Sequence, residues 1–144
     1  MIKKIKINSL DRFLKPKNVL VIGGGVWGKS IVFQLKKIGF NGKIFAVHPS
    51  EEMFCGCNTY NNIDELPVSI DAAFVGVNRF ATIDIISQLS KANCGGAVCF
   101  ASGFSEAVSE LKDGHELHES LINMAGEMPI LGPNCYGIIN YFDN

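Results

Sequence analysis

Short apolar runs alternate along this chain with longer segments in which apolar residues recur every three or four positions. The runs are rich in β-branched and aromatic residues and show no polar alternation, which is typical of strands buried on both faces. We therefore expect strands at Asn18–Gly23, Lys43–His48, Asp71–Val77, Gly95–Ser102 and Met128–Pro133. The stretch "CNTYNN" is a candidate for one more short strand.

The periodic segments predict helices that follow these strands. Their expected bounds are Trp27–Gly39, Arg79–Cys94 and Ser105–Glu127, with a shorter amphipathic helix at Ser9–Lys17. Ser9 is a candidate N-cap of the short helix, and an interruption of the last helix is expected near Asp113–Gly114. The spacing predicts core positions at Ile31, Leu35 and Ile38 in one helix and at Phe80, Ile83, Ile86 and Leu89 in the next.

Strands that alternate with helices at this spacing form parallel βαβ units with right-handed crossovers. The 144 residues therefore predict a single α/β domain with a Rossmann-like, doubly wound and mostly parallel sheet. In such folds ligands bind at the carboxyl ends of the strands. The expected strand ends carry "GGGVWG", "HPS", "VNRF", "ASGFS" and "GPNCYG". Small and polar residues gather at all of them, so this edge is the expected ligand site.

Charge and cysteine content narrow the class of protein. The formal net charge of −1 provides no positive field that would recruit nucleic acid or anionic lipid, so we expect neither partner. Five cysteines without a signal peptide favour reduced thiols and a cytoplasmic location. No apolar run approaches the length of a membrane span, so we expect no membrane segment. No metal site is expected, because Cys55 and Cys57 lack a second ligand pair.

Gly23, Gly25 and Gly28 form a G-x-G-x-x-G pattern between an expected strand and an expected helix. In this pattern the first glycine allows a tight turn, the second leaves space for a phosphate, and the third lets the helix pack on the strand. Free N–H groups at the helix start would then hold the anion. Lys29 and Ser30 lie in the first turn, where they would add a charge and a hydroxyl.

Other interpretations of this glycine-rich segment stay open. Gly23–Ser30 also matches the P-loop pattern G-x-x-x-x-G-K-S, but the later strands end without the Asp that organises Mg²⁺. An NAD site usually has an acid at the end of the second strand, whereas here that strand ends "AVHPS" and Glu51 and Glu52 follow only in the loop. A glycine-rich turn without a ligand, in an interaction domain that keeps only the fold, is the third alternative.

The order of motifs from Leu10 to Asn140 resembles the N-terminal CoA-binding domain of the ADP-forming acyl-CoA synthetases. That superfamily includes the succinyl-CoA synthetase alpha subunit and bacterial protein acetyltransferases with a fused synthetase-like region. "ASGFSE" followed by "LGPNCYGIIN" carries the resemblance more specifically than the glycine loop. The resemblance implies an arm with a short helix over residues 1–17 and a CoA-binding Rossmann-like domain over residues 18–144.

The resemblance also implies which residues meet coenzyme A. Trp27, Gly28, Lys29 and Ser30 would meet the phosphates, and Pro49 would border the adenosine. Val77 and Asn78 would flank the pantetheine arm, and Asn134 and Cys135 would lie near the thiol end. The residues expected to line the pocket for the remainder of the cofactor are Phe100, Ala101 and Ser102.

Two departures from the family pattern qualify this expectation. Relatives often place a Lys or Arg after the proline equivalent to Pro49, whereas here Ser50, Glu51 and Glu52 follow, so it is open whether the CoA 3′-phosphate is bound. His48, His115 and His118 do not match the histidine that is phosphorylated in the complete enzymes. We therefore expect no catalytic residue here, and a ligase activity that needs further synthetase domains or subunits. An NAD(H)-binding regulatory or redox module is the alternative function.

Overall fold

The structure is a computed structural model of the chain and describes residues 7–23, 25–49 and 53–139, with side chains from residue 10. The helices are α1 (Ile7–Leu14), α2 (Gly25–Lys37), α3 (Arg79–Lys91) and α4 (Gly114–Ala125). Short 3₁₀ turns lie at η1 (Ile63–Glu65) and η2 (Ser105–Ala107). The strands are β1 (Asn18–Gly23), β2 (Lys43–Val47), β3 (Met53–Phe54), β4 (Cys57–Tyr60), β5 (Ala72–Gly76), β6 (Ala97–Cys99) and β7 (Ile130–Leu131).

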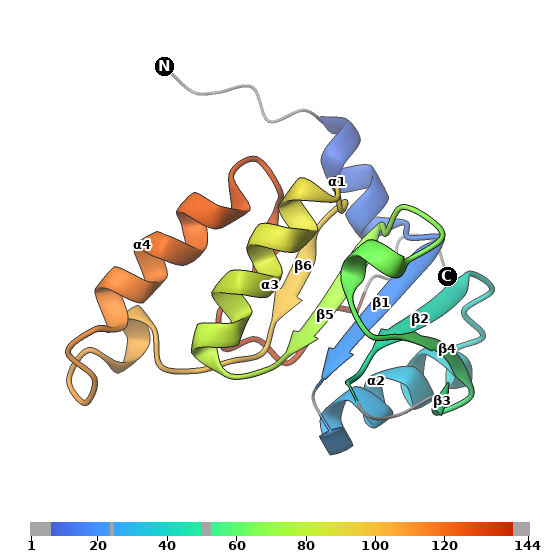
Figure 1. The fold of residues 1–144 in the computed structure, drawn as a ribbon, viewed down its shortest axis with the longest axis horizontal. Coiled ribbons are helices and arrows are strands. Elements are labelled where there is room, and N and C mark those ends of the chain that lie inside the picture. Colours follow the sequence, from blue (N-terminus) through green and yellow to red (C-terminus); the bar gives the residue numbers. More distant parts are fainter. Residues whose placement is uncertain (1–6, 24, 50–52, 140–144) are drawn as a thin grey trace.

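The strands form one sheet in the order β3-β4-β2-β1-β5-β6-β7 (Figure 1). Every neighbouring pair is parallel except β3 with β4, which is an antiparallel edge hairpin. The strand order reverses between β1 and β5, where Gly23 pairs with Gly76. The expected Rossmann-like, doubly wound and mostly parallel sheet is therefore confirmed, with its switch point at the carboxyl ends of β1 and β5.

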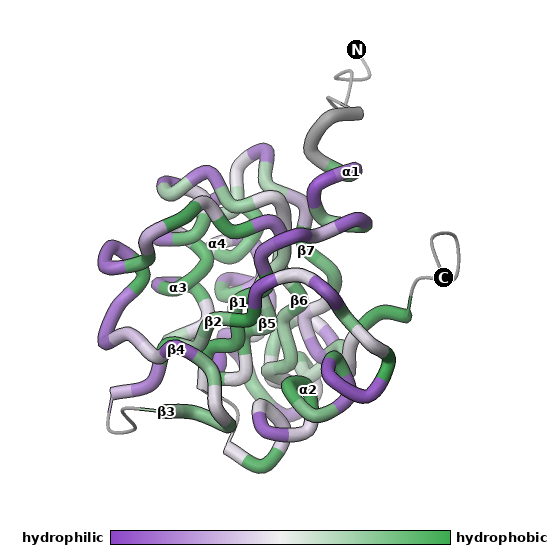
Figure 2. Tube along the Cα trace, turned by 90° about the vertical axis from the view of Figure 1, so that its right-hand side faces the viewer, coloured by the Kyte–Doolittle hydropathy of each residue, from purple (hydrophilic) through white to green (hydrophobic). Residues whose placement is uncertain are grey.

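Successive side chains of the central strands point to opposite faces of the sheet, and each face has its own core. Leu20 and Ile22 of β1 belong to a core that includes Ile86 of α3 and Leu121 of α4. Val21 belongs to the other core, with side chains from α1 and α2. Figure 2 shows the strands between α3 and α4 on one side and α2 with α1 on the other. Both faces of β1 are thus buried, as its unbroken apolar run predicts.

Several expected element bounds differ from those observed. Ser9 was the expected N-cap, but α1 begins at Ile7 and Ser9 lies inside it. Ile38 was an expected core position, but α2 ends at Lys37 and Ile38 is 75% exposed. Phe80 was another expected core position, but it is exposed. It lies in the first turn of α3, where the Arg79 guanidinium is 4.7 Å from the centre of the Phe80 ring.

The segments after β5 show two further differences. The strand expected at Gly95–Ser102 is only Ala97–Cys99, although the Phe100 N–H still donates to the Val75 carbonyl of β5 at 3.1 Å. The helix expected at Ser105–Glu127 is wrong in its first part, because Ser105–Ala107 is only a 3₁₀ turn and α4 begins at Gly114. A side chain at Gly114 would collide with the Phe104 carbonyl, so only glycine fits at the start of α4.

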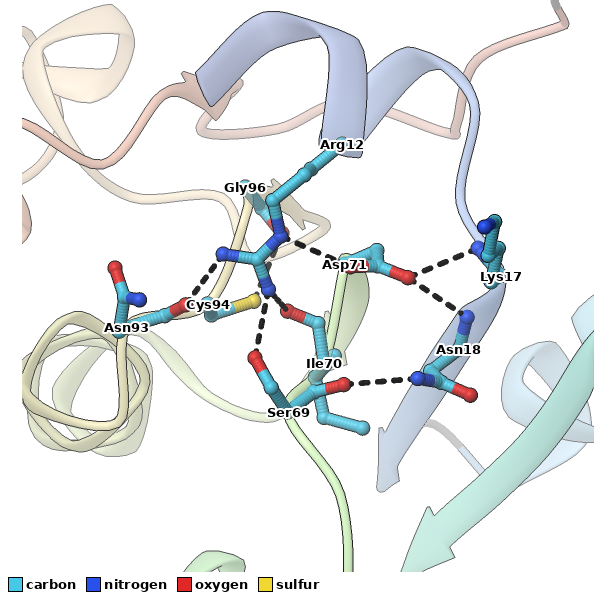
Figure 3. Close-up of polar contacts among 9 residues, drawn as sticks. All are labelled: Arg12, Lys17, Asn18, Ser69, Ile70, Asp71, Asn93, Cys94 and Gly96. Carbon is cyan, nitrogen blue, oxygen red and sulfur yellow. Dashed lines mark hydrogen bonds and ion pairs between the residues drawn. The ribbon is translucent and has the colours of Figure 1, made fainter. Parts of the chain in front are cut away.

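Arg12 and Asp71 join α1 to the amino edge of the sheet (Figure 3). Arg12 Nε donates to Asp71 Oδ1 at 3.0 Å, while the other guanidinium nitrogens donate to Ser69 Oγ and to the carbonyls of Ile70 and Asn93. Asp71 Oδ2 accepts the backbone N–H groups of Lys17 and Asn18, at 2.9 and 3.0 Å. One ion pair therefore ties α1 to the starts of β1 and β5 and to the end of α3. The domain boundary expected at residue 17 stays a prediction.

We predict that Arg12→Met lowers the free energy of unfolding by about 2 kcal/mol, because it keeps the apolar stem and removes the charged donors. Urea unfolding measures this change. Lys91→Met, at an exposed position in the last turn of α3, is the matched control and should change the value by less than about 0.5 kcal/mol. Equal effects of the two substitutions would show that the Arg12 network contributes nothing specific.

The same network predicts a pH dependence of stability. Burial raises the pKa of Asp71, but hydrogen bonds from the Lys17 N–H, the Arg12 guanidinium and the Asn18 N–H outweigh it, so the net pKa is lowered. The stabilisation is present above the unfolded-state pKa of about 3.9 and is lost as pH falls through the lower folded-state value. The stability difference between the wild type and Asp71→Asn should therefore shrink as pH falls from about 6 to about 3. A constant difference would contradict this assignment.

Candidate functional site

A cavity of about 670 Å³ lies at the carboxyl edge of the sheet, on the loops that follow β1, β5, β6 and β7. Its volume is within the usual range of small-molecule sites. It is lined by Gly25, Trp27, Gly76, Val77, Asn78, Arg79, Phe100, Ala101, Ser102, Asn134, Cys135 and Tyr136. The loops of the switch point between β1 and β5 thus form part of its wall, where doubly wound sheets bind their ligands.

The cavity brings together most of the residues singled out by their sequence motifs. The expected residues that line it are Gly25, Trp27, Val77, Asn78, Phe100, Ala101, Ser102, Asn134 and Cys135. Those that do not line it are Gly23, Gly28, Lys29, Ser30 and Pro49. Gly76 and Tyr136 line it without having been singled out as site residues, and Arg79 lines it as well. Tyr136 directly follows Asn134 and Cys135 in "GPNCYG", so the motif itself carried that signal. The binding role of all these residues stays a prediction.

The three glycines of the β1–α2 turn differ in what surrounds them. Gly23 has φ +61°, and a Cβ there would lie 2.8 Å from Val77 Cγ1. A Cβ at Gly28 would collide with the Gly23 carbonyl oxygen, so only glycine lets α2 pack this closely on β1. Gly25 has φ +48° and no neighbour within 4 Å of the Cβ position. The turn therefore has no room for a side chain at Gly23 or Gly28 but has room at Gly25, which lines the cavity.

The polar groups expected around the phosphates lie on the other side of the α2 N-terminus. Lys29 is exposed, and its Nζ lies 5.8 Å from the centre of the Phe54 ring in β3. His48 stacks on the same ring at 5.6 Å, and Pro49 follows it as an exposed residue. Ser50, Glu51 and Glu52, on which the question of the 3′-phosphate depends, lie outside the described residues.

The β5–α3 turn is fixed by Asn78. Its Oδ1 accepts hydrogen bonds from the N–H groups of Phe80 and Ala81, at 3.1 and 3.0 Å, which is an N-cap of α3. Val77, one residue earlier, packs against Gly23 of β1. The capping bond explains why a short polar residue follows β5, and it holds this cavity wall against the glycine turn.

Arg79 clamps the loop that follows β6. Its Nη1 and Nη2 donate to the two carboxylate oxygens of Asp113 at 2.8 and 3.0 Å, and Nη1 also donates to the Gly103 carbonyl at 2.9 Å. Hydrogen bonds from Arg79 hold the pKa of Asp113 below its usual value. Glu106 Oε1 accepts the Gly103 N–H at 2.8 Å. These contacts fix the backbone of the "ASGFSE" segment at Gly103, next to its residues that line the cavity.

The two motifs that resemble the acyl-CoA synthetases lie side by side. The Asn134 N–H donates to the Ala101 carbonyl at 2.9 Å, and the Cys135 N–H donates to the Cys99 carbonyl at 3.0 Å. Asn134 has φ +59°, a left-handed conformation that asparagine tolerates better than most residues. Residues about 33 positions apart in sequence are thus joined by backbone bonds into one wall. All five cysteines are described, and none forms a disulfide.

Two kinds of feature are absent from the described ranges 7–23, 25–49 and 53–139. No group of three His, Cys, Asp or Glu side chains there is arranged to hold a metal ion. None of the helices in these ranges has the length and apolar character needed to cross a membrane.

Comparison with known proteins connects this geometry to a family. Residues 17–141 match the family model of a CoA binding domain. A trans-feruloyl-CoA synthase from an unidentified prokaryote is 36% identical over 98% of this chain and 20% of its own length. An ADP-forming acetate–CoA ligase of Archaeoglobus fulgidus is 33% identical over 93% of this chain and 20% of its own length. The chain thus spans about a fifth of the length of these relatives.

Solved structures agree with the fold. The dinucleotide-forming acetyl-coenzyme A synthetase 1 of Ca. Korarchaeum cryptofilum in its apo form superposes with a TM-score of 0.80 at 29% identity, over 89% of this chain and 28% of that one. Prephenate dehydrogenase from A. aeolicus, solved with NAD⁺, superposes with a TM-score of 0.62 at 21% identity, over 78% of this chain and 40% of that one. The second likeness shows the fold alone, so the fold by itself does not choose between CoA and NAD. The match to the family model, in contrast, extends over residues 17–141. The chain therefore belongs to the CoA binding domain family.

Proposed function

We propose that this chain binds coenzyme A or an acyl-CoA at the carboxyl edge of its sheet, as the CoA-binding part of an NDP-forming acyl-CoA synthetase. The observation that carries the proposal is the open position at Gly25, which faces a cavity lined by both family motifs. A phosphate and an extended arm of one ligand can therefore bind next to each other.

The pyrophosphate is assigned to the N-terminus of α2. The first N–H groups of a helix have no intrahelical partner, and the helix dipole favours an anion there. The empty space above Gly25 allows a phosphate to reach these groups. Lys29, in the same first turns of α2, adds a positive charge near this end. Ser30 is half-buried on the same helix and would add a hydroxyl.

The uncharged pantetheine arm is assigned to the cavity. Arg79 is the one ionised group among the described lining residues, and both of its terminal nitrogens donate hydrogen bonds to Asp113. A cavity without an unpaired cation suits amides and methylenes better than phosphates. Val77 and Asn78 would flank the arm, with Asn134 and Cys135 near its thiol. Pro49 does not line the cavity and would border the adenosine outside it.

In the complete reaction this chain would hold and orient the thiol while other parts of a synthetase activate the acid. Holding a reactant in one geometry lowers the entropic barrier of the transfer step. The named relatives act on different acids, ferulate and acetate among them, so their names do not choose the acid for this chain. Further synthetase domains or subunits are the proposed partners.

An NAD(H)-binding module is the second candidate, because the same fold holds NAD⁺ in prephenate dehydrogenase. The cavity argues against it, since the described residues that line it include no carboxylate to bind the ribose hydroxyls. The same absence among these residues argues against a P-loop site, which needs an Asp near its Mg²⁺.

Titration calorimetry with CoA, dephospho-CoA and NADH separates these candidates. We expect CoA to bind and NADH to release no measurable heat. Equal affinities for CoA and dephospho-CoA would mean that the 3′-phosphate is left in solvent, in line with the acidic residues after Pro49. Binding of NADH without binding of CoA would contradict the proposed function.

Gly25→Val should weaken CoA binding at least about tenfold, a loss of about 1.4 kcal/mol, because the side chain occupies the space assigned to the phosphate. Gly39→Val is the matched control. Gly39 also has a left-handed φ, +76°, and open space at its Cβ position, but it lies past the other end of α2. Both variants place valine at a left-handed φ with open space around it, but only the first fills the space assigned to the phosphate, so only the first should lose affinity. If a folded Gly25→Val protein bound CoA with unchanged affinity, the assignment of the phosphate to this turn would be wrong.

A further inference from the structure

Three aromatic side chains from distant parts of the sequence meet at the cavity. Trp27 lies 5.4 Å from Phe100 and 5.9 Å from Tyr136, and Phe100 lies 5.7 Å from Tyr136, measured between ring centroids. All three line the cavity. Each ring therefore touches the other two, and we call this group the aromatic cluster.

The aromatic cluster is anchored at one side and open at the other. Phe100 is half-buried and packs on Phe74 of β5 at 6.0 Å, which ties the cluster to the sheet. Trp27 and Tyr136 remain 53% and 74% exposed. Large apolar rings that stay this accessible at the wall of a cavity are typical of a ligand surface rather than of a core.

The chemistry of the cavity restricts what such a surface can bind. Among the described residues that line it, Arg79 is the one cation and is paired with Asp113 at 2.8 Å, and none of them is a carboxylate. Aromatic faces bind planar rings by stacking, whatever the polar substituents of the ring. The ligand group that fits the aromatic cluster is therefore a neutral planar ring.

A CoA thioester can supply such a ring from its adenine or from its acyl group. Adenine on the aromatic cluster would bring the neighbouring 3′-phosphate dianion to a cavity without an unpaired cation, which is unfavourable. An aromatic acyl group brings no charge. Tyr136 also adjoins Asn134 and Cys135, to which the thiol end is assigned under the proposed function. Both considerations favour the acyl end.

We propose that Trp27, Phe100 and Tyr136 determine acyl specificity, and that the chain prefers aromatic acyl-CoA thioesters to short aliphatic ones. This inference rests on the proposed function, because it needs CoA in the same cavity. It assigns the Trp27 ring to the acyl group in place of the phosphate contact that the resemblance implied, while the phosphate stays assigned to the backbone N–H groups at the start of α2. The three residues contact the acyl ring and take no part in bond formation.

The test compares CoA, acetyl-CoA and benzoyl-CoA by titration calorimetry on the full chain. We expect benzoyl-CoA to bind at least about tenfold more tightly than acetyl-CoA, the gain expected for one stacked ring. Trp27 is the chain's only tryptophan, so its fluorescence should change with benzoyl-CoA more than with acetyl-CoA. Tyr136→Ala should reduce the benzoyl-to-acetyl affinity ratio to below about threefold, and Tyr136→Phe should restore it, because phenylalanine keeps the stacking face.

Phe33→Ala is the matched control, since Phe33 is an aromatic of α2 that is 62% exposed and does not line the cavity. It should leave the benzoyl-to-acetyl ratio unchanged. Equal affinities of the wild type for acetyl-CoA and benzoyl-CoA would overturn this inference and leave the proposed function standing. A loss of affinity in Tyr136→Ala that is the same for all three ligands would assign the ring to adenine and also overturn it. Failure of all three ligands to bind would overturn the proposed function itself.

Discussion

The close packing of α2 on β1 is the constraint on which the site depends. At Gly28 the helix approaches the Gly23 carbonyl so closely that no side chain fits between them. This contact fixes where α2 begins, and so places the open position at Gly25 and the ring of Trp27 at the carboxyl edge of the sheet. Without it the N–H groups of the helix and the cavity would not adjoin.

The second organising feature is the separation of charge around that helix start. Lys29 points to the Phe54 side, over the β3 edge, whereas the cavity side is lined by neutral groups and one paired arginine. A ligand with an anionic head and a neutral arm matches this division, because each part meets groups of its own polarity. The Arg12–Asp71 network acts at the opposite edge, where it holds α1 and the strand starts together. Stability and ligand binding are thus assigned to opposite ends of the same strands.

Local patterns predict much of this structure, and long-range contacts account for the remainder. The apolar run Asn18–Gly23 predicts β1 with the observed bounds, and the alternation of strands and helices predicts the parallel sheet. Arg12 and Asp71 are 59 residues apart, and no periodicity links them. The strand expected at Gly95–Ser102 is observed only as Ala97–Cys99, and the residues that follow it line the cavity. The aromatic cluster joins the first turn of α2 to the segments after β6 and β7, so only the folded chain reveals it.

The central claim is that one ligand spans the α2 N-terminus and the adjoining cavity. A crystal structure of this chain with CoA tests it most directly. The account predicts pyrophosphate oxygens within hydrogen-bond distance of the backbone N–H groups at the start of α2, and a pantetheine arm that runs past Val77 toward Cys135. CoA bound elsewhere on the protein, or a pyrophosphate inside the cavity against Arg79, would contradict it.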